Sequence, residues 1–230
     1  MLSPDGRVVM VSGASRGIGA AVCRHLLHAG FLVSGGMRTP QDTIAHRNYF
    51  PHVYEALSPT SARQWVDATV QRFGRIDAIA NIAGINPRVL VDQEGEEELD
   101  RMWAVNVKAP LRLVRAALPH LKASGSGRVI NLASLAGRRV GTNVGYAMTK
   151  FAVVALTHGI RQEFWDDGIR ASAVCPGYVM TDMTAHETEV APADMTQPED
   201  VAEIVRMILS LPNSASTAEV LVNCRKESML

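Results

Sequence analysis

Residues Arg7–Gly19 read RVVMVSGASRGIG, so a short β-branched run leads directly into a glycine-rich turn. The run predicts a buried strand over residues 7–12, and an apolar helical pattern follows over residues 18–29. Glycine at positions 13, 17 and 19 permits a tight turn and a close approach of the backbone to a ligand. A strand, a glycine turn and a helix in this order predict the start of a βαβ unit.

The same alternation continues to the end of the chain. The apolar runs predict strands over residues 7–12, 31–37, 52–57, 77–81, 128–134, 170–175 and 219–224. Helical patterns cover residues 18–29, 41–47, 60–73, 95–122, 144–165 and 198–210. Apolar strands that alternate with helices indicate a parallel sheet with both faces covered. We therefore expect an α/β fold: a Rossmann-like, doubly wound parallel sheet of about seven strands with helices on both faces.

Length and composition favour a single domain over residues 1–230. Twenty-three basic residues balance 23 acidic ones without long runs, which gives no electrostatic footprint for nucleic acid or an anionic membrane. No window approaches the ~20 apolar residues of a membrane span, and MLSPDGRVVM (1–10) is too polar for a signal peptide. Three widely spaced cysteines suit a reducing compartment and argue against a disulfide framework or a metal site. A cytoplasmic protein is expected.

The glycine turn predicts a phosphate site, because the N–H groups and the positive dipole end of the following helix point into it. Its spacing is G-x3-G-x-G rather than G-x-G-x-x-G, so a tight turn without a ligand is the alternative. Arg16 lies inside the turn, and Arg38 follows the second strand, where NAD sites carry an acidic residue. Two arginines near the adenosine ribose would pair with a 2′-phosphate, which favours NADP(H) over NAD(H).

The stretch GYAMTK (145–150) places Tyr146 and Lys150 on one helix face, with Cβ atoms ~5–6 Å apart. An ordinary surface pair is the alternative to a functional one. An unperturbed phenol has a pKa of about 10, and bringing that pKa close to neutrality requires roughly 4 kcal/mol of differential stabilisation. One exposed lysine does not supply this, whereas a desolvated lysine together with a cationic nicotinamide ring does. The pair thus predicts a tyrosine that exchanges protons with an alcohol or carbonyl oxygen.

Six motifs follow one another along the chain: SGASRGIG (12–19), NIAG (81–84), NVKAP (106–110), NLAS (131–134), YAMTK (146–150) and PGYVMT (176–181). This ordered set resembles the short-chain dehydrogenase/reductase family, and in particular 3-oxoacyl-[acyl-carrier-protein] reductases and related carbonyl reductases. The resemblance extends from about Arg7 to Val222.

The resemblance implies that Tyr146 is the acid/base and that Lys150 binds the nicotinamide ribose and lowers the phenol pKa. Ser134 would hold the substrate oxygen, and Asn106 would hold a water that links the lysine to solvent. PGYVMT would cover the nicotinamide, with Thr181 near its carboxamide. The implied cofactor positions are Gly13, Ser15, Arg16, Gly17, Ile18, Gly19, Arg38, Leu57, Asn81, Ala83, Gly84, Tyr146, Lys150, Pro176, Gly177, Val179 and Thr181.

The chain departs from the family pattern in four places, one of which is the short region over residues 39–51 between the second and third strands. Ile82 occupies a commonly polar or small position, and Ala56 stands where an aspartate usually meets the adenine, which leaves a backbone contact. The common V-D-G-G ending is absent. Because many relatives use that end between subunits, the geometry of an expected homodimer or homotetramer stays open.

These observations predict an NADPH-dependent oxidoreductase that moves a hydride between nicotinamide and a carbonyl or alcohol carbon of a small molecule. Two alternatives stay open. One is a 3-oxoacyl reductase that receives its substrate on an acidic carrier protein, with Arg138 and Arg139 at a basic mouth. The other is a non-catalytic dinucleotide sensor on the same fold. Residues 178–197 are expected to form a substrate loop that acts as a lid, with Met183 and His186 as lining residues.

Overall fold

The computed structural model describes residues 1–40, 44–141 and 143–225. Within them, seven strands form one parallel sheet in the order β3-β2-β1-β4-β5-β6-β7, which confirms the predicted doubly wound α/β fold. The strands are β1 (Val8–Ser12), β2 (Leu32–Met37), β3 (Tyr49–Val53), β4 (Ala78–Asn81), β5 (Arg128–Leu132), β6 (Arg170–Pro176) and β7 (Glu219–Val222). From β1 the chain first adds β2 and β3 on one side and then returns to add β4 on the other side. Ligands of such sheets bind at this switch point, beyond the carboxyl ends of the strands.

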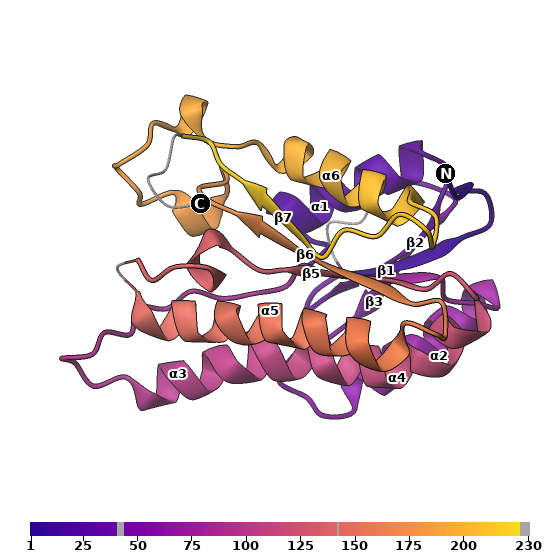
Figure 1. Cartoon of the computed structure of the whole chain (residues 1–230), viewed down its shortest axis with the longest axis horizontal. Coiled ribbons are helices and arrows are strands. Elements are labelled where there is room, and N and C mark those ends of the chain that lie inside the picture. Colours follow the sequence, from indigo (N-terminus) through magenta and orange to yellow (C-terminus); the bar gives the residue numbers. More distant parts are fainter. Residues whose placement is uncertain (41–43, 142, 226–230) are drawn as a thin grey trace.

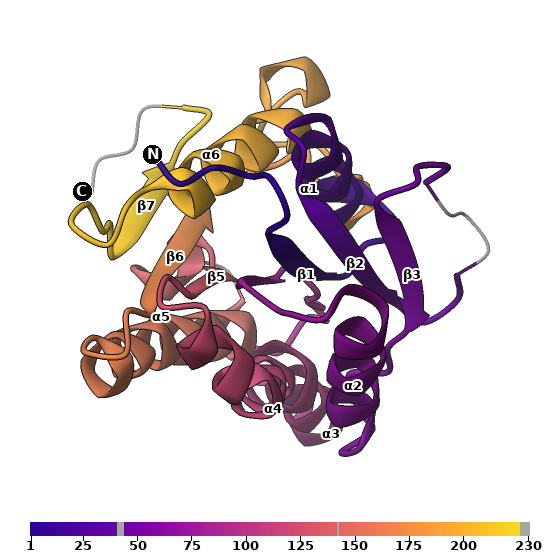
Figure 2. The ribbon, with the colours of Figure 1, turned by 90° about the vertical axis from the view of Figure 1, so that its right-hand side faces the viewer.

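Helices cover both faces of the sheet, as Figures 1 and 2 show. One face carries α1 (Gly17–His28) and α6 (Pro198–Ser210), and the other carries α2 (Ser61–Phe73), α4 (Ala109–Ala123) and α5 (Val144–Phe164). Each face has its own apolar core, because successive side chains of a strand point to opposite sides. Val9 and Val11 of β1 belong to the core under α1 and α6, whereas Met10 packs with Trp65 of α2 on the other side.

Shorter helical segments lie at the ends of the strands and helices. α3 (Glu96–Met102) continues into the π-helical segment η1 (Trp103–Lys108) and then into α4. The 3₁₀ segments are η2 (Leu135–Gly137), η3 (Asp182–Thr184) and η4 (Pro192–Asp194). The predicted continuous helix over residues 95–122 is therefore interrupted by a wider turn, which places Asn106 in an irregular part of the backbone.

The predicted bounds of the third strand, residues 52–57, were wrong. β3 spans Tyr49–Val53 and contains Pro51, which the edge of a sheet tolerates because one side of an edge strand forms no ladder hydrogen bonds. Of the predicted helix over residues 41–47, residues 41–43 lie outside the described residues, and residues 44–46 form no helix. The last strand ends at Val222, two residues before its predicted end.

Candidate active site

The glycine turn lies at the switch point of the sheet, against the segment that follows β4. Gly13 adopts a φ of 71°, and a Cβ atom there would lie 3.0 Å from the Cα atom of Ala83. A Cβ atom on Gly19 would lie 2.0 Å from the carbonyl oxygen of Gly13. Cβ atoms at these positions would meet backbone atoms, so only glycine lets the turn pack this closely against Ala83 and against the start of α1. The free N–H groups at the start of that helix suit a phosphate.

Ser12 and Asn81 attach the segment after β4 to the neighbouring strands. The two residues are partners in the β1–β4 register, and the Ser12 hydroxyl accepts hydrogen bonds from the backbone N–H groups of Ile82 and Ala83 at 3.0 and 3.1 Å. The Asn81 amide is buried and donates to Oδ1 of Asn131 at 2.8 Å. The Asn81 side chain therefore supports the sheet interior, and only its backbone faces the cofactor edge.

Asn106 fastens the chain after NIAG to the π-helical segment. Its Oδ1 accepts from the Ile85 N–H at 2.9 Å, and its Nδ2 donates to the Ile85 carbonyl at 2.9 Å. The same Nδ2 donates to the Thr149 hydroxyl at 3.1 Å. Asn106 is 2% exposed, and both polar atoms of its side chain form hydrogen bonds with protein groups.

Lys150 reaches the same place from α5. Its ammonium donates to the carbonyl oxygen of Leu132 at 2.7 Å and is buried. A Cβ atom on Gly84 would lie 3.4 Å from Oδ1 of Asn106 and 3.7 Å from Nζ of Lys150. Four motifs that are far apart in the sequence therefore meet at this point, because Leu132 belongs to NLAS and Gly84 to NIAG.

Tyr146 and Ser134 lie next to this ammonium. The Lys150 Nζ atom lies 5.4 Å from the centre of the Tyr146 ring, as expected for positions one helical turn apart. Ser134 caps η2: its hydroxyl accepts from the Ala136 N–H at 3.1 Å and donates to the carbonyl oxygen of Pro176 at 3.3 Å. The structure thus brings the predicted Ser, Tyr, Lys and Asn together at the carboxyl edge of the sheet.

Burial dominates the electrostatics of the tyrosine and the lysine. Burial raises the pKa of Tyr146 to about 12, and the hydrogen bond with Ser134 opposes this shift. Burial lowers the pKa of Lys150 to about 8, with Cys175 acting in the other direction. The expected fall of the phenol pKa is therefore not produced by the protein's own groups, because the loss of solvation outweighs the hydrogen bond with Ser134.

The segment after β6 folds back on itself. The Met180 N–H donates to the Thr196 carbonyl at 2.9 Å, and the Thr196 N–H donates to the Tyr178 carbonyl at 3.1 Å, so the two ends of the substrate loop are paired. At its base, the Gly177 N–H donates to the Val222 carbonyl of β7 at 2.9 Å. The segment between these paired ends contains η3 and η4.

The other predicted lid and cofactor residues occupy more open positions. Met183 is 40% exposed, and the His186 side chain is 74% exposed beside Glu187, so neither is enclosed in a cavity. Ser15 and Arg38 are exposed, and Leu57 is 47% exposed. The side chains of Ile18 and Val179 pack in the core under α1 and α6, which leaves their backbones for a cofactor.

Two side chains that position the site were not singled out from the sequence. Asn143 caps α5 by accepting from the Tyr146 N–H at 3.3 Å, and its Nδ2 donates to the Pro87 carbonyl at 2.8 Å. Thr149 donates to the Tyr146 carbonyl at 2.8 Å and accepts from Asn106. An asparagine directly before a helical pattern is an N-cap signal, whereas nothing in the local pattern separates Thr149 from an ordinary helix residue.

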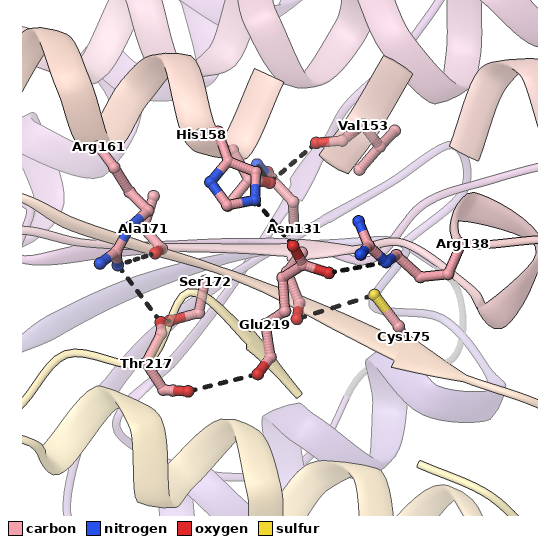
Figure 3. A network of polar contacts seen from close by, with 12 residues as sticks. Asn131, Arg138, Val153, His158, Arg161, Ala171, Ser172, Cys175, Thr217 and Glu219 are labelled. Carbon is pink, nitrogen blue, oxygen red and sulfur yellow. Dashed lines mark hydrogen bonds and ion pairs between the residues drawn. The ribbon is translucent and has the colours of Figure 1, made fainter. Parts of the chain in front are cut away.

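The loop that follows Ser134 is attached to the edge strand β7, as Figure 3 shows. Glu219 of β7 lies between Nε2 of His158 on α5, at 2.8 Å, and Nε of Arg138 at the end of η2, at 3.3 Å. Cys175 of β6 is a free cysteine, and burial, followed by the charge of the same carboxylate, raises the pKa of its thiol to about 11. Arg138 thus has an acidic partner within the chain.

Across residues 1–40, 44–141 and 143–225, no three or more His, Cys, Asp or Glu side chains are grouped in a way that suits a metal ion. None of the helices in the same residues combines the length and the apolarity that a membrane crossing needs.

Known proteins resemble this chain over most of its length. A family model described as short chain dehydrogenase matches residues 7–192. The agropine synthesis reductase of Rhizobium rhizogenes is 38% identical over 229 residues, which make up 96% of this chain and 53% of that protein. An uncharacterized oxidoreductase of Staphylococcus saprophyticus is 31% identical over 244 residues, covering 97% of this chain and 98% of the relative. The chain thus spans about half the length of the agropine synthesis reductases that it matches.

A solved structure shares the fold over nearly its whole length. The X-ray structure of an alcohol dehydrogenase from the archaeon Thermococcus sibiricus, complexed with 5-hydroxy-NADP, aligns with a TM-score of 0.85 and 28% identity. The alignment covers 94% of this chain and 95% of that one. With a family model matched over most of its length, relatives named as reductases or oxidoreductases, and this shared fold, the chain belongs to the short-chain dehydrogenase/reductase family of oxidoreductases.

Proposed function

We propose that this chain is a single catalytic domain that reduces a small-molecule carbonyl to an alcohol with NADPH. The observation that carries the proposal is the convergence of Ser134, Tyr146 and the buried Lys150 ammonium beside the glycine turn. The alcohol dehydrogenase from Thermococcus sibiricus, complexed with 5-hydroxy-NADP, supports a phosphorylated dinucleotide as the partner of such a site.

The residues present fit this cofactor. The pyrophosphate would lie at the start of α1, where Gly13, Gly17 and Gly19 let the backbone approach it closely, and Lys150 would hold the nicotinamide ribose. Arg16 and Arg38 would hold the 2′-phosphate, because each follows one of two adjacent parallel strands and both are exposed at the same edge. When bound, the cofactor supplies the hydride.

Tyr146 would donate the proton. With a pKa of about 12, the phenol is protonated throughout the neutral range, as the acid in a reduction must be. Ser134 would hold the substrate oxygen beside this hydroxyl, and Lys150 would stabilise the tyrosinate that remains, since its ammonium lies close to the ring. Asn143 and Thr149 would keep the first turn of α5, and therefore the phenol, in place.

The test is NADPH oxidation by the purified protein with a panel of small ketones and diketones. Tyr146→Phe keeps the ring and removes the proton, so we expect at least a hundredfold loss of kcat, of the order of general acid catalysis, with NADPH binding retained. Turnover that survives this substitution would remove Tyr146 from the proposed role. Ser134→Ala is the matched comparison, and its loss is expected to depend on the substrate.

The carrier-protein alternative has less support. A putative ketoacyl reductase of a monensin polyketide synthase from Streptomyces virginiae is 30% identical over 255 residues. Arg138, however, is paired with Glu219 and offers less net positive charge to an acidic carrier than the sequence suggested. The sensor alternative predicts no turnover in the same assay. Homodimeric or homotetrameric assembly and a cytoplasmic location are parts of our proposal, and light scattering tests the first.

A further inference from the structure

An ion pair joins the glycine turn to the lid. Nη1 of Arg16 donates to Oδ2 of Asp182 at 2.6 Å, across 166 positions of sequence. Both side chains are open to solvent, with 70% and 72% of their surfaces exposed. Arg16 is one of the two arginines that the proposed function assigns to the 2′-phosphate of the cofactor, so the pair uses a group that the cofactor requires.

The backbone on the lid side of the pair is held firmly. Asp182 is the first residue of η3 and directly follows Thr181, whose N–H donates to the Thr184 hydroxyl at 3.2 Å. The hydroxyls of Thr181 and Thr184 both donate to the carbonyl oxygen of Val179, at 3.3 and 2.6 Å. Val179 itself is buried and bridged to Thr196. The carboxylate therefore projects from a fixed turn.

The backbone on the other side is held by the turn itself. Arg16 has an extended backbone and precedes the first residue of α1, Gly17, whose φ is 51°. A Cβ atom on Gly17 would lie 3.2 Å from Cγ2 of Thr181, so the turn and the lid touch directly beside the ion pair. The two charged side chains extend from neighbouring, packed segments, and this arrangement makes their contact a property of the fold.

The pair changes the charge that a cofactor would meet. Arg16 next to Asp182 presents a net charge near zero, whereas Arg16 alone presents a full positive charge. A 2′-phosphate would have to share the Arg16 guanidinium with the carboxylate or displace the carboxylate from it. NADH has no phosphate at this position and would not meet this cost.

We propose that Asp182 is a specificity-determining residue that weakens the binding of NADPH relative to NADH by holding Arg16. This inference rests on the proposed use of NADP(H). It extends that proposal by naming a lid residue that opposes the preference set by the two arginines. By thermodynamic linkage, the 2′-phosphate loosens the contact between turn and lid by the same factor.

The expected effect is small and measurable. Exposed ion pairs contribute about 0.2–1 kcal/mol, which corresponds to at most about a fivefold change in Kd. We expect Asp182→Asn to lower the Kd for NADPH about two- to fivefold and to leave the Kd for NADH unchanged. The measurement is titration of the purified chain with each nucleotide, by calorimetry or protein fluorescence, at low and at high salt.

A double-mutant cycle separates the ion pair from a general effect of charge. In the Arg16→Met background, Asp182→Asn is expected to change neither Kd, because the group that it releases is absent. An equal gain in that background would overturn the proposal, since the carboxylate would then act on the phosphate alone. Asp194→Asn is the matched control, because Asp194 is an exposed lid carboxylate for which the described residues show no ion pair.

Arg38→Met distinguishes this inference from the proposed function. If Arg38→Met weakens NADPH binding and Asp182→Asn leaves both constants unchanged, the inference fails and the NADP(H) preference stands. If Arg16→Met and Arg38→Met both leave the ratio of the two Kd values unchanged, the proposed cofactor preference fails as well.

Discussion

Replacing the buried lysine of the site with methionine is expected to make the protein more stable. Burial lowers the pKa of Lys150 from 10.5 to about 8, so the folded state disfavours the charged form. At pH 7 the lysine is protonated in both states, and this fall in pKa corresponds to about 3 kcal/mol of destabilisation. Lys150→Met removes that cost and leaves the carbonyl of Leu132 without its donor, which costs about 1 kcal/mol.

The net expectation for Lys150→Met at pH 7 is therefore a gain of about 2 kcal/mol in the free energy of unfolding, or about 4–8 °C in Tm. The assay is urea unfolding followed by circular dichroism at several pH values. Because the folded pKa is the lower one, the unfolded wild type binds more protons between pH 8 and pH 10, and its stability rises over that range. The advantage of Lys150→Met should shrink over the same range.

The control is Lys122→Met, which removes a half-exposed lysine from α4 and is expected to change stability by less than about 0.5 kcal/mol. A Lys150→Met variant that is less stable than the wild type at pH 7, with no pH dependence of the difference, would refute the reasoning. It would show that the contacts of the ammonium outweigh its lost solvation. The variant is expected to have lost its reductase activity, so a gain in stability would mark Lys150 as a residue kept for function.

Three further predictions follow from the packing of the site and of the sheet. Gly35→Ala should destabilise the protein by about 1–3 kcal/mol, because the new Cβ atom would lie 2.2 Å from the Tyr49 hydroxyl. Adding Tyr49→Phe should restore part of the lost stability, and thermal unfolding of the single and double variants measures both effects. Asn143→Ala removes the cap of α5 and should cost about 1 kcal/mol in urea unfolding and lower kcat more than it raises KM. In a pH profile of kcat, carbonyl reduction should fall as pH rises through about 8, the folded pKa of Lys150, because the cation that stabilises the tyrosinate is then lost; a flat profile to pH 10 would contradict this.

The elements of the fold were largely predictable from the sequence. Apolar strands alternating with helical patterns predicted a parallel, doubly wound sheet, because a strand buried on both faces must be apolar at every position. The failures were local. The start of β3 was missed because it contains Pro51, and proline is tolerated in a strand mainly at the edge of a sheet. The sequence of a single strand does not show whether that strand lies at an edge. The helix over 95–122 was predicted as continuous because apolar periodicity does not report a π-helical turn.

The sequence predicts Ser134, Tyr146 and Lys150 as site residues because each stands in a short motif whose order along the chain is informative. Their electrostatics could not be predicted in this way. The pKa of Tyr146 is raised because the phenol is buried, and its burial depends on how segments that are far apart in the sequence pack around it. The hydrogen bonds of Asn106 to Ile85 and Thr149 likewise join segments that only the folded chain brings together.

Local sequence thus determined the strands, the helices and the chemical types of the site residues, because hydrophobic period, turn chemistry and motif spacing act over a few residues. Tertiary structure alone decided which charges meet. Arg16 lies in the glycine turn and Asp182 in the segment after β6, 166 positions apart, and neither motif indicates that the other is near. The physical reason is that solvation and Coulomb interactions depend on burial and on distance in space. Burial and distance are set only when the sheet has formed and helices cover its two faces.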